Sequence, residues 1–295
     1  MPREGVLSSV PTLLIRGGHV ALLDDDFTVL SDGAVAIVGN RIEAVGSASD
    51  VGARYDGAET IDASGKLVMP GLINAHTHLY SALARGLVAD IEPSSNFTEI
   101  LDHLWWRLDR ALTLDDVRLS AAAGAIDLIR NGTTTIIDHH ASQVHIDGSL
   151  SAVAEPLDES GLRFNLCFEV SDRNGEAARE AGLAENERFA RHIGSRRGSS
   201  GEPGSSTDTD RDQKRAGTSV GLHASFTLDD ATLEHAAGMA GDLGVGCHIH
   251  AAEDVADVED SMRRSGKRVV ERLESFGVLG PRSIAAHCIH VDARE

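Results

Sequence analysis

The sequence predicts an α/β protein in which a parallel barrel follows a small β-rich portion. From about residue 70 onward, apolar strand-like runs alternate with helix-length segments, which is typical of a parallel α/β fold. The phosphate-binding patterns GxGxxG and GxxxxGK do not follow the first of these runs, so a barrel is preferred to a doubly wound sheet. We therefore expect residues 1–69 to form the small portion and residues 70–295 to form the barrel portion.

Residues 12–69 are expected to form short strands joined by turns. The stretches TLLIRGG, AVAIVGNRIEAVG and ETIDASGKLVMPG alternate apolar and polar residues around Gly-Asn and Asp-Ala-Ser-Gly turns. This alternation predicts a small β-sandwich-like unit.

Six buried strands are expected in the barrel portion. They are GLINAH (71–76), TTIIDH (134–139), RFNLCFE (163–169), SVGLHA (219–224), VGCHIH (245–250) and SIAAHC (283–288). Several of the segments between them have apolar residues spaced by about 3.6, begin with Asp or Thr caps and end at Gly, as helices do. The polar stretch 195–217, rich in Ser, Gly, Asp and Arg, predicts a flexible surface insertion before the fourth strand.

The composition limits the partners and the compartment. The 295 residues include 46 acidic residues against 27 Lys and Arg, and the net charge of −19 argues against nucleic acid or an anionic membrane as a partner. No run approaches the ~18 apolar residues of a membrane span, and the first residues lack the apolar core of a signal peptide. The three cysteines form no CxxC pair, as expected of free thiols in a reducing compartment. We expect an acidic cytoplasmic protein.

Two histidines in NAHTHL stand at the end of the first barrel strand. Alternate residues of a strand face the same side, so His76 and His78 can both point into the barrel. Active sites of parallel barrels lie at this carboxyl end of the strands. An HxH pair alone is weak evidence, because a structural pair is equally compatible with it.

Histidines also stand at the ends of the later strands, and this clustering is hard to explain by packing. Imidazoles that converge on one mouth are what a hydrolytic metal site requires. The residues concerned are His139 and His140 in DHH, His223 in GLHAS, His248, His250 and Glu253 in CHIHAAE, and His287 in AAHCIH.

These motifs resemble those of a known enzyme family. PGLINAHTHL, CHIHAAE and AAHCIH resemble the amidohydrolase superfamily, most closely its single-metal branch of cyclic deaminases and chlorohydrolases. LWWRLDRALT, TTTIIDHHAS and GLHASFTLDD resemble aminohydrolases of the SsnA type. The resemblance implies a (β/α)8, TIM-like hydrolase barrel.

The resemblance also implies the metal ligands. His76, His78 and His250 match the family's ligands and would bind a divalent metal ion, with zinc preferred and iron and manganese as alternatives. Two-metal members of the superfamily use a carboxylated lysine from the fourth strand. The expected fourth strand, SVGLHASFT, contains no lysine, so one metal ion is expected.

Three further residues match catalytic or binding positions of the family. Glu253 matches the residue that moves a proton to the substrate ring, and His287 matches a histidine that hydrogen-bonds the attacking water or the substrate. His223 matches a substrate-orienting position. These roles imply a hydrolase of non-peptide C–N bonds, which deaminates a purine- or pyrimidine-like heterocycle with metal-activated water. An alternative is chlorohydrolase-like displacement on a triazine-like ring.

The remaining histidines near the strand ends, and two tryptophans, are expected mainly to pack in the interior. His248 is expected to be a deeper, hydrogen-bonded core residue. Of His139 and His140, one is expected to line the pocket and the other to pack. Trp105 and Trp106 are expected to pack in the core, with a pocket role for one as the alternative.

The chain ends soon after the sixth expected strand. The family also uses an aspartate at the end of strand eight, and Asp292 follows strand six instead. We therefore expect an incomplete barrel of about six strand–helix units that is poorly active by itself. The non-enzymatic alternative is a catalytically inactive fragment that binds a metal or a partner. A complementing C-terminal chain is one expected partner, and the resemblance implies a homodimer as another.

Overall fold

The computed structural model describes residues 12–87, 91–198 and 215–295. The chain divides into two compact units, Met1–Gly71 and Leu72–Glu295, and each is described by itself. The predicted insertion at 195–217 lies mostly outside the described residues, and its described ends instead belong to a helix that reaches Gly198 and a strand that begins at Ala216.

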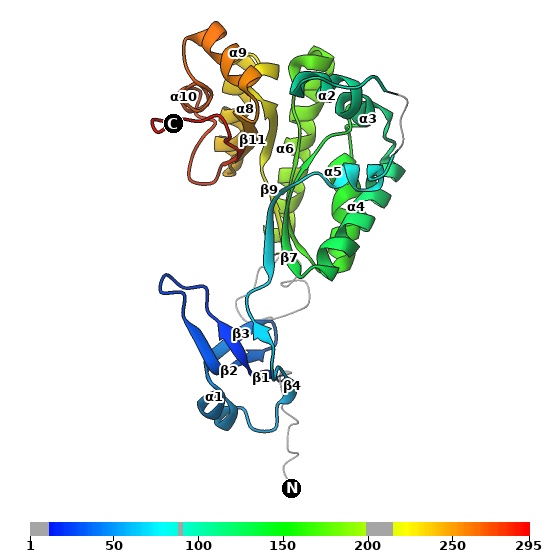
Figure 1. Ribbon diagram of the computed structural model, residues 1–295. Coiled ribbons are helices and arrows are strands. Elements are labelled where there is room, and N and C mark those ends of the chain that lie inside the picture. The colour runs from blue at the N-terminus through cyan, green and yellow to red at the C-terminus, as the bar shows by residue number, and fades with distance from the viewer. Residues whose placement is uncertain (1–11, 88–90, 199–214) are drawn as a thin grey trace. The chain divides into compact units, whose positions relative to one another are not determined.

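The first unit is one mixed sheet with a helix packed on it (Figure 1). The strand order is β3 (Arg41–Ser47), β2 (Val29–Val38), β1 (Thr12–Ala21) and β4 (Glu59–Asp62), and β5 (Leu67–Val68) also pairs with β1. Helix α1 (Ala48–Arg54) contributes Val51 to a small core with Leu14, Ala34 and Ala36. The described residues therefore form a single sheet covered by a helix, where the sequence suggested a sandwich-like arrangement.

The second unit contains parallel strands in two sheets. One sheet has the order β6 (Leu72–Thr77), β7 (Thr133–His140), β8 (Arg163–Phe168) and β9 (Ala216–Thr218). The other has the order β10 (Val220–Ala224), β11 (Cys247–Ala251) and β12 (Ile284–His287). Every residue of β10 and β11 is buried, as expected of strands covered on both faces.

The two sheets meet between β9 and β10, where β10 coincides with the expected fourth strand and β9 is a further short strand just before it. Val170 forms an isolated parallel bridge with Leu222 across this seam. The approach is close, because a Cβ built on Gly221 would lie 2.3 Å from the carbonyl oxygen of Phe168. Each sheet also has its own hydrophobic cluster, one that includes Phe168 and another that includes Val170 and Leu222.

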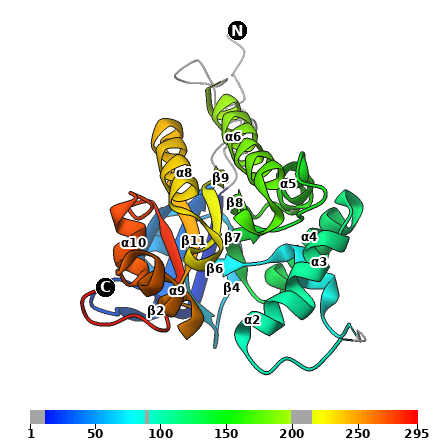
Figure 2. The same ribbon diagram turned by 90° about the horizontal axis from the view of Figure 1, so that it is seen from above.

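Helices follow the strands and lie outside them (Figure 2). Thr113 caps α4 (Leu114–Arg130) in a reciprocal capping box with Asp116, and Asp229 and Asp254 cap α8 (Asp230–Leu243) and α9 (Val255–Ser265). The helices that cover the strands are α4 (Leu114–Arg130), α5 (Ser149–Ser160), α6 (Glu176–Gly198), α8 (Asp230–Leu243), α9 (Val255–Ser265) and α10 (Val269–Ser275).

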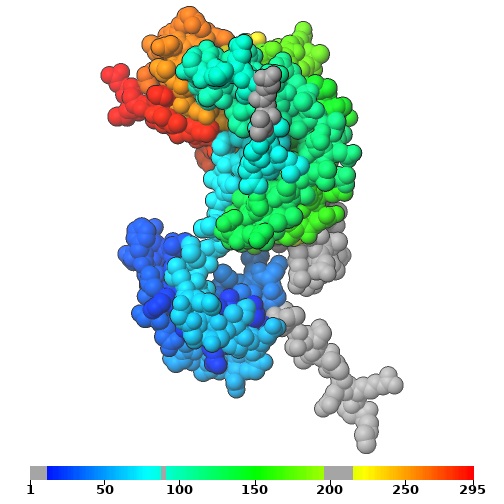
Figure 3. Space-filling model, turned by 45° about the vertical axis from the view of Figure 1, so that its right-hand side comes forward, coloured from blue at the N-terminus to red at the C-terminus, as the bar shows by residue number. Residues whose placement is uncertain are grey.

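A helical excursion separates β6 from α4. It comprises η1 (Leu79–Ala84), α2 (Phe97–Ile100), one π-helical turn η2 (Leu101–Trp105) and α3 (Trp106–Ala111). The η1 segment packs against α4, with Leu79 next to Gly124. Figure 3 shows the cyan surface of this part of the chain against the green surface of the segments that follow. This packing closes one side of the mouth of the strands.

The predicted fold class, a partial parallel α/β barrel after a small β-unit, is confirmed. The strands lie within a few residues of the expected runs, because each is a short apolar segment. The expectation that all six are buried is wrong for β6 and β12, most of whose residues are exposed or partly exposed. Two further short helices, η3 (Asp172–Asn174) and η4 (Ser225–Thr227), follow β8 and β10. Among the described residues, no helix is long and apolar enough to cross a membrane.

Candidate metal centre

A cavity of about 520 Å³ opens at the carboxyl ends of the strands of the second unit. The sequence-predicted residues meet there, although they are spread over more than two hundred positions. The polar and aromatic side chains that line it include His76, His78, Tyr80, Trp105, Trp106, Asp109, Glu169, His223, His250, Glu253 and His287.

The three predicted metal ligands form a compact group. His76 ends the inner face of β6, His78 follows that strand, and His250 lies on β11. One ring nitrogen from each can be chosen so that all three lie within 4.8 Å of one another. The Nε2 atoms of His78 and His250 are 3.2 Å apart.

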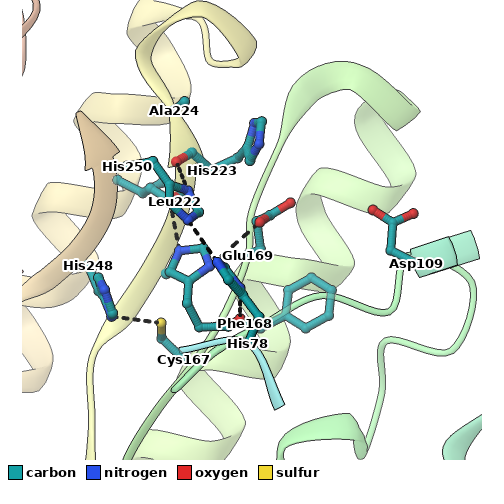
Figure 4. A network of polar contacts seen from close by, with 12 residues as sticks. His78, Asp109, Cys167, Phe168, Glu169, Leu222, His223, Ala224, His248 and His250 are labelled. Atoms are coloured by element: carbon teal, nitrogen blue, oxygen red, sulfur yellow. Dashed lines mark hydrogen bonds and ion pairs between the residues drawn. The ribbon is translucent and has the colours of Figure 1, made fainter. Parts of the chain in front are cut away.

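Backbone carbonyls fix the tautomers of two of these imidazoles (Figure 4). His78 Nδ1 lies 2.7 Å from the carbonyl oxygen of His139, and His250 Nδ1 lies 2.7 Å from that of His223. A carbonyl only accepts, so both Nδ1 atoms carry the proton and donate it. The Nε2 lone pairs of His78 and His250 therefore face each other across 3.2 Å.

A side chain orients the third imidazole. His76 Nδ1 lies 2.9 Å from His248 Nε2, and His76 Nε2 is buried without a hydrogen bond. The other nitrogen of His248 lies 3.7 Å from the sulfur of Cys167. His248 is fully buried, so its predicted role as a hydrogen-bonded core residue is confirmed.

The chemistry of the three nitrogens suits a metal ion. Burial lowers the pKa of all three, and it lowers that of His76 to about 3 together with the nearby His78. The imidazoles are therefore neutral at neutral pH, as metal ligands must be. For Zn–N bonds of ~2.0–2.1 Å, tetrahedral ligands lie about 3.3 Å apart. The separation of the His78 and His250 nitrogens fits this value.

Glu253 and His287 form the rim of the cavity. Glu253 Oε2 and His287 Nε2 lie 3.5 Å apart, and the two side chains are 31 % and 28 % exposed. Burial, with the charges of Asp254 and Glu169, raises the pKa of Glu253 to about 6. Two residues of the rim region have a positive φ, which non-glycine residues seldom adopt. They are Ala252, with a φ of 48°, and His287, with a φ of 70°.

His223 presents an acceptor to the cavity. Thr227 Oγ1 donates to the carbonyl of Ala224, so it accepts from His223 Nδ1 at 2.6 Å. Burial, with the charge of Arg173, lowers the pKa of His223 to about 3, so the ring is neutral and Nε2 keeps its lone pair. The indole of Trp106 lies edge-on at 6.2 Å.

A buried network of charged side chains that also borders the cavity, formed by Asp109, Glu169 and Arg173, was not predicted from the sequence. Arg173 donates to Asp109 and, at 3.2 Å, to Glu169, and its guanidinium lies 5.0 Å from the ring of Trp106. The sequence held one signal, because Glu169 directly follows the buried strand RFNLCF at its carboxyl end. The sequence held no such signal for Asp109 and Arg173, because each pairs with a residue on an element distant in the chain.

Two expectations need correction. The expectation that His139 or His140 lines the cavity is wrong, because both are fully buried. His139 Nε2 donates to the carbonyl of Leu222, and His140 Nε2 lies 2.9 Å from Ser142 Oγ. Trp105 and Trp106 both line the cavity, because the helical excursion turns them toward it.

Comparison with known proteins agrees with this geometry. Residues 67–295 match the model of the amidohydrolase family. The chain is 31% identical over 282 residues to the 5-methylthioadenosine/S-adenosylhomocysteine deaminase of Symbiobacterium thermophilum, covering 95% of this chain and 58% of that protein. It is also 31% identical over 289 residues to the 5'-deoxyadenosine deaminase of Methanothermobacter thermautotrophicus, covering 98% and 58%. The chain thus spans a little over half the length of these relatives.

Solved structures share the fold. A zinc-bound adenosine deaminase from Xanthomonas campestris superposes with a TM-score of 0.76 at 24% identity, over 95% of this chain and 58% of that one. Atrazine chlorohydrolase TrzN from Arthrobacter aurescens TC1, complexed with zinc, gives 0.71 at 25% identity, over 95% and 61%. The family match covers most of the chain and includes the three-histidine group. The chain belongs to the amidohydrolase family.

Proposed function

We propose that this protein is a zinc-dependent aminohydrolase that deaminates an adenine-type nitrogen heterocycle. The observation that carries the proposal is the set of three neutral imidazoles, those of His76, His78 and His250, each with a ring nitrogen within 4.8 Å of the others at the base of the cavity. The deaminases to which the chain is 31% identical support the reaction and the class of substrate.

One zinc ion is proposed at the three histidines. Bound there, zinc would supply a water whose pKa falls to ~7 and so a hydroxide nucleophile at neutral pH. The protein's part is to keep the ligand nitrogens unprotonated. The two backbone carbonyls do so for His78 and His250 by accepting from their Nδ1 atoms, and His76 would do the same by donating from Nδ1 to His248 Nε2.

Glu253 is proposed to transfer the proton that deamination requires. Its pKa of about 6 allows it to hold or release a proton near neutral pH. Attack on a ring carbon places negative charge on the adjacent ring nitrogen, and the acid form of Glu253 would donate to that nitrogen. His287, 3.5 Å from Glu253, would hydrogen-bond the attacking water or the substrate.

The remaining walls are proposed to orient the heterocycle. His223 Nε2 would accept a hydrogen bond from a ring N–H or a hydroxyl group. Trp105, Trp106 and Phe97 line the cavity and offer aromatic surfaces to a flat ring. The cavity volume lies within the ~300–1,000 Å³ typical of small-molecule sites.

The similarity to atrazine chlorohydrolase supports a second candidate, displacement of chloride from a triazine-like ring. The same activated water would attack a ring carbon in either reaction. The leaving group separates them, because deamination releases ammonia and dechlorination releases chloride.

The test measures metal binding and turnover separately. Chelator-treated protein is reloaded with zinc, and ammonia release is followed with adenosine, 5'-deoxyadenosine and adenine. Because residues 1–295 span 58% of the length of the related deaminases, we expect slow zinc-dependent ammonia release, which the Glu253→Gln variant loses while it keeps its zinc. Chloride release from a chlorinated triazine, with no ammonia from any adenine compound, would replace the proposal with the second candidate. A zinc-loaded protein that releases neither product contradicts both reactions for this chain and supports the alternative of a catalytically inactive metal-binding fragment.

A further inference from the structure

Asp257, in the first turn of α9, is a buried carboxylate that joins two backbone segments near the cavity. The residue is 2% exposed. Its Oδ2 accepts from the backbone N–H of Ala252 at 2.9 Å, and its Oδ1 accepts from the backbone N–H of Phe226 at 2.9 Å. A carboxylate suits this position because it has two acceptor oxygens and no donor. One side chain therefore connects the segment after β11 to η4, the short helix after β10.

The segment after β11 carries Glu253. Ala252 precedes it with a φ of 48°, a conformation that a non-glycine residue keeps only where its surroundings hold it. Asp257 holds the N–H of Ala252, and the carbonyl of Ala252 accepts from the N–H groups of Ile289 and His290. The direction in which the Glu253 side chain leaves the backbone therefore depends on these hydrogen bonds.

The helix η4 carries the residue that orients His223. Thr227 Oγ1 accepts from His223 Nδ1 at 2.6 Å, and the ring of Phe226 lies 5.8 Å from that of His223. Phe226 and Thr227 are adjacent, so the hydrogen bond from Phe226 N–H to Asp257 also fixes the backbone from which Thr227 projects. The orientation of the His223 ring therefore depends on the same carboxylate.

We propose that Asp257 is a positioning residue that fixes the backbone under Glu253 and under the partner of His223, although Asp257 itself does not line the cavity. This rests on the proposed function for the roles of Glu253 and His223. The backbone is held while the Glu253 carboxyl remains free to turn. The partners of the three metal-site histidines lie on strands β7, β10 and β11, so loss of Asp257 should spare zinc binding.

Amide hydrogen exchange of the zinc-loaded protein, followed by NMR, tests the two hydrogen bonds without any need for turnover. Asp257→Ala should speed exchange at the N–H groups of Ala252 and Phe226 by roughly tenfold or more, because both lose their acceptor. Asp257→Asn keeps one acceptor oxygen, so it should restore protection at one of the two amides. If the Ala variant does not fold, faster exchange at one amide of the Asn variant is the expected result.

Ser261→Ala is the matched control. Ser261 is also on α9 and fully buried, but its hydroxyl donates to the carbonyl of Lys267, away from the two segments. It should leave exchange at Ala252 and Phe226 unchanged, although it also removes a buried hydrogen bond. Unchanged exchange at both amides in folded Asp257 variants would overturn the proposal.

Single-turnover kinetics test the consequence for the reaction. Enzyme in excess over adenosine extends the measurement of ammonia release to slow variants. Asp257→Asn should lower the rate by about 10–100-fold with full zinc content, because a misplacement of ~1 Å has an effect of this size, and Ser261→Ala should not lower it. In the Glu253→Gln background the same substitution should lower the rate by less than about twofold, because the group that it positions is already absent.

The outcomes separate the positioning role from the proposed function. Equal losses of rate from Asp257→Asn in the native and Glu253→Gln backgrounds would show that Asp257 acts independently of Glu253, and would overturn the positioning role alone. Loss of zinc from folded Asp257→Asn would also overturn it. If the native zinc-loaded protein releases no ammonia, the proposed function fails, and the exchange experiment then decides whether Asp257 fixes the two segments.

Discussion

The base and the rim of the cavity are held in different ways. At the base, the Nδ1 atoms of His76, His78 and His250 all have hydrogen-bonding partners at 2.7–2.9 Å. At the rim, Glu253 and His287 are partly exposed and 3.5 Å apart. A preformed base suits a metal ion, which needs fixed ligands, and a loosely held rim suits groups that must move protons and adjust to a substrate.

Removing a ligand from the base should have the largest effect. His250→Asn takes away one of three nitrogens, and we expect the ion at the three-histidine site to be lost. Elemental analysis after gel filtration would measure it, with His235→Asn, on the surface of α8, as the control. Full metal content in a folded His250→Asn protein would show that the base does not bind metal as proposed.

Substitution at the rim should reduce the rate and spare the metal. Glu253→Gln should lower kcat by 10²–10⁴-fold, the usual contribution of general acid–base catalysis. The reaction needs Glu253 as the acid and the activated water as hydroxide, so these two groups together carry one ionisable proton in the reactive form. The pH profile of kcat/KM should therefore rise through about 6, where Glu253 titrates, and fall above ~7, where the water titrates. A profile without a limb near pH 6 would remove Glu253 from the proton path.

Substitution of His248, the hydrogen-bonding partner of His76 at the base, should have an intermediate effect on zinc affinity. His248→Leu deprives His76 Nδ1 of its partner, and we expect zinc affinity to fall by 10–100-fold, as for other residues that orient a metal ligand. His248→Gln can restore part of the affinity because its amide can hydrogen-bond. Competition with a chromophoric chelator measures both, and equal affinities in the native and Leu proteins would contradict the orienting role.

A change remote from the base and the rim should have the smallest effect. Thr113→Ala breaks the reciprocal cap of α4 and should lower the free energy of unfolding by ~1 kcal/mol, measured by urea denaturation. Zinc affinity and the pH profile should not change. Thr113→Ser keeps the capping hydroxyl and serves as the control.

The sequence predicted the strands and the histidines well because both depend on local patterns. Short apolar runs give buried strands, and alternation within HTH and HIH sends two imidazoles to one face. The network of Asp109, Glu169 and Arg173 was not predictable, because each member hydrogen-bonds a residue on another element. The short strand β9 was not predicted for a similar reason, since its pairing with β8, in a different sheet from β10, is decided by tertiary contacts.

The seam between the two sheets has a mechanical consequence. His76 and His78 belong to the end of β6 in one sheet, and His250 belongs to β11 in the other. The sheets are joined at the Val170–Leu222 bridge, and each has its own core. An ion that binds all three histidines would therefore clasp the two sheets at their open end. Chelation should then speed amide exchange at the seam before the rest of the unit unfolds.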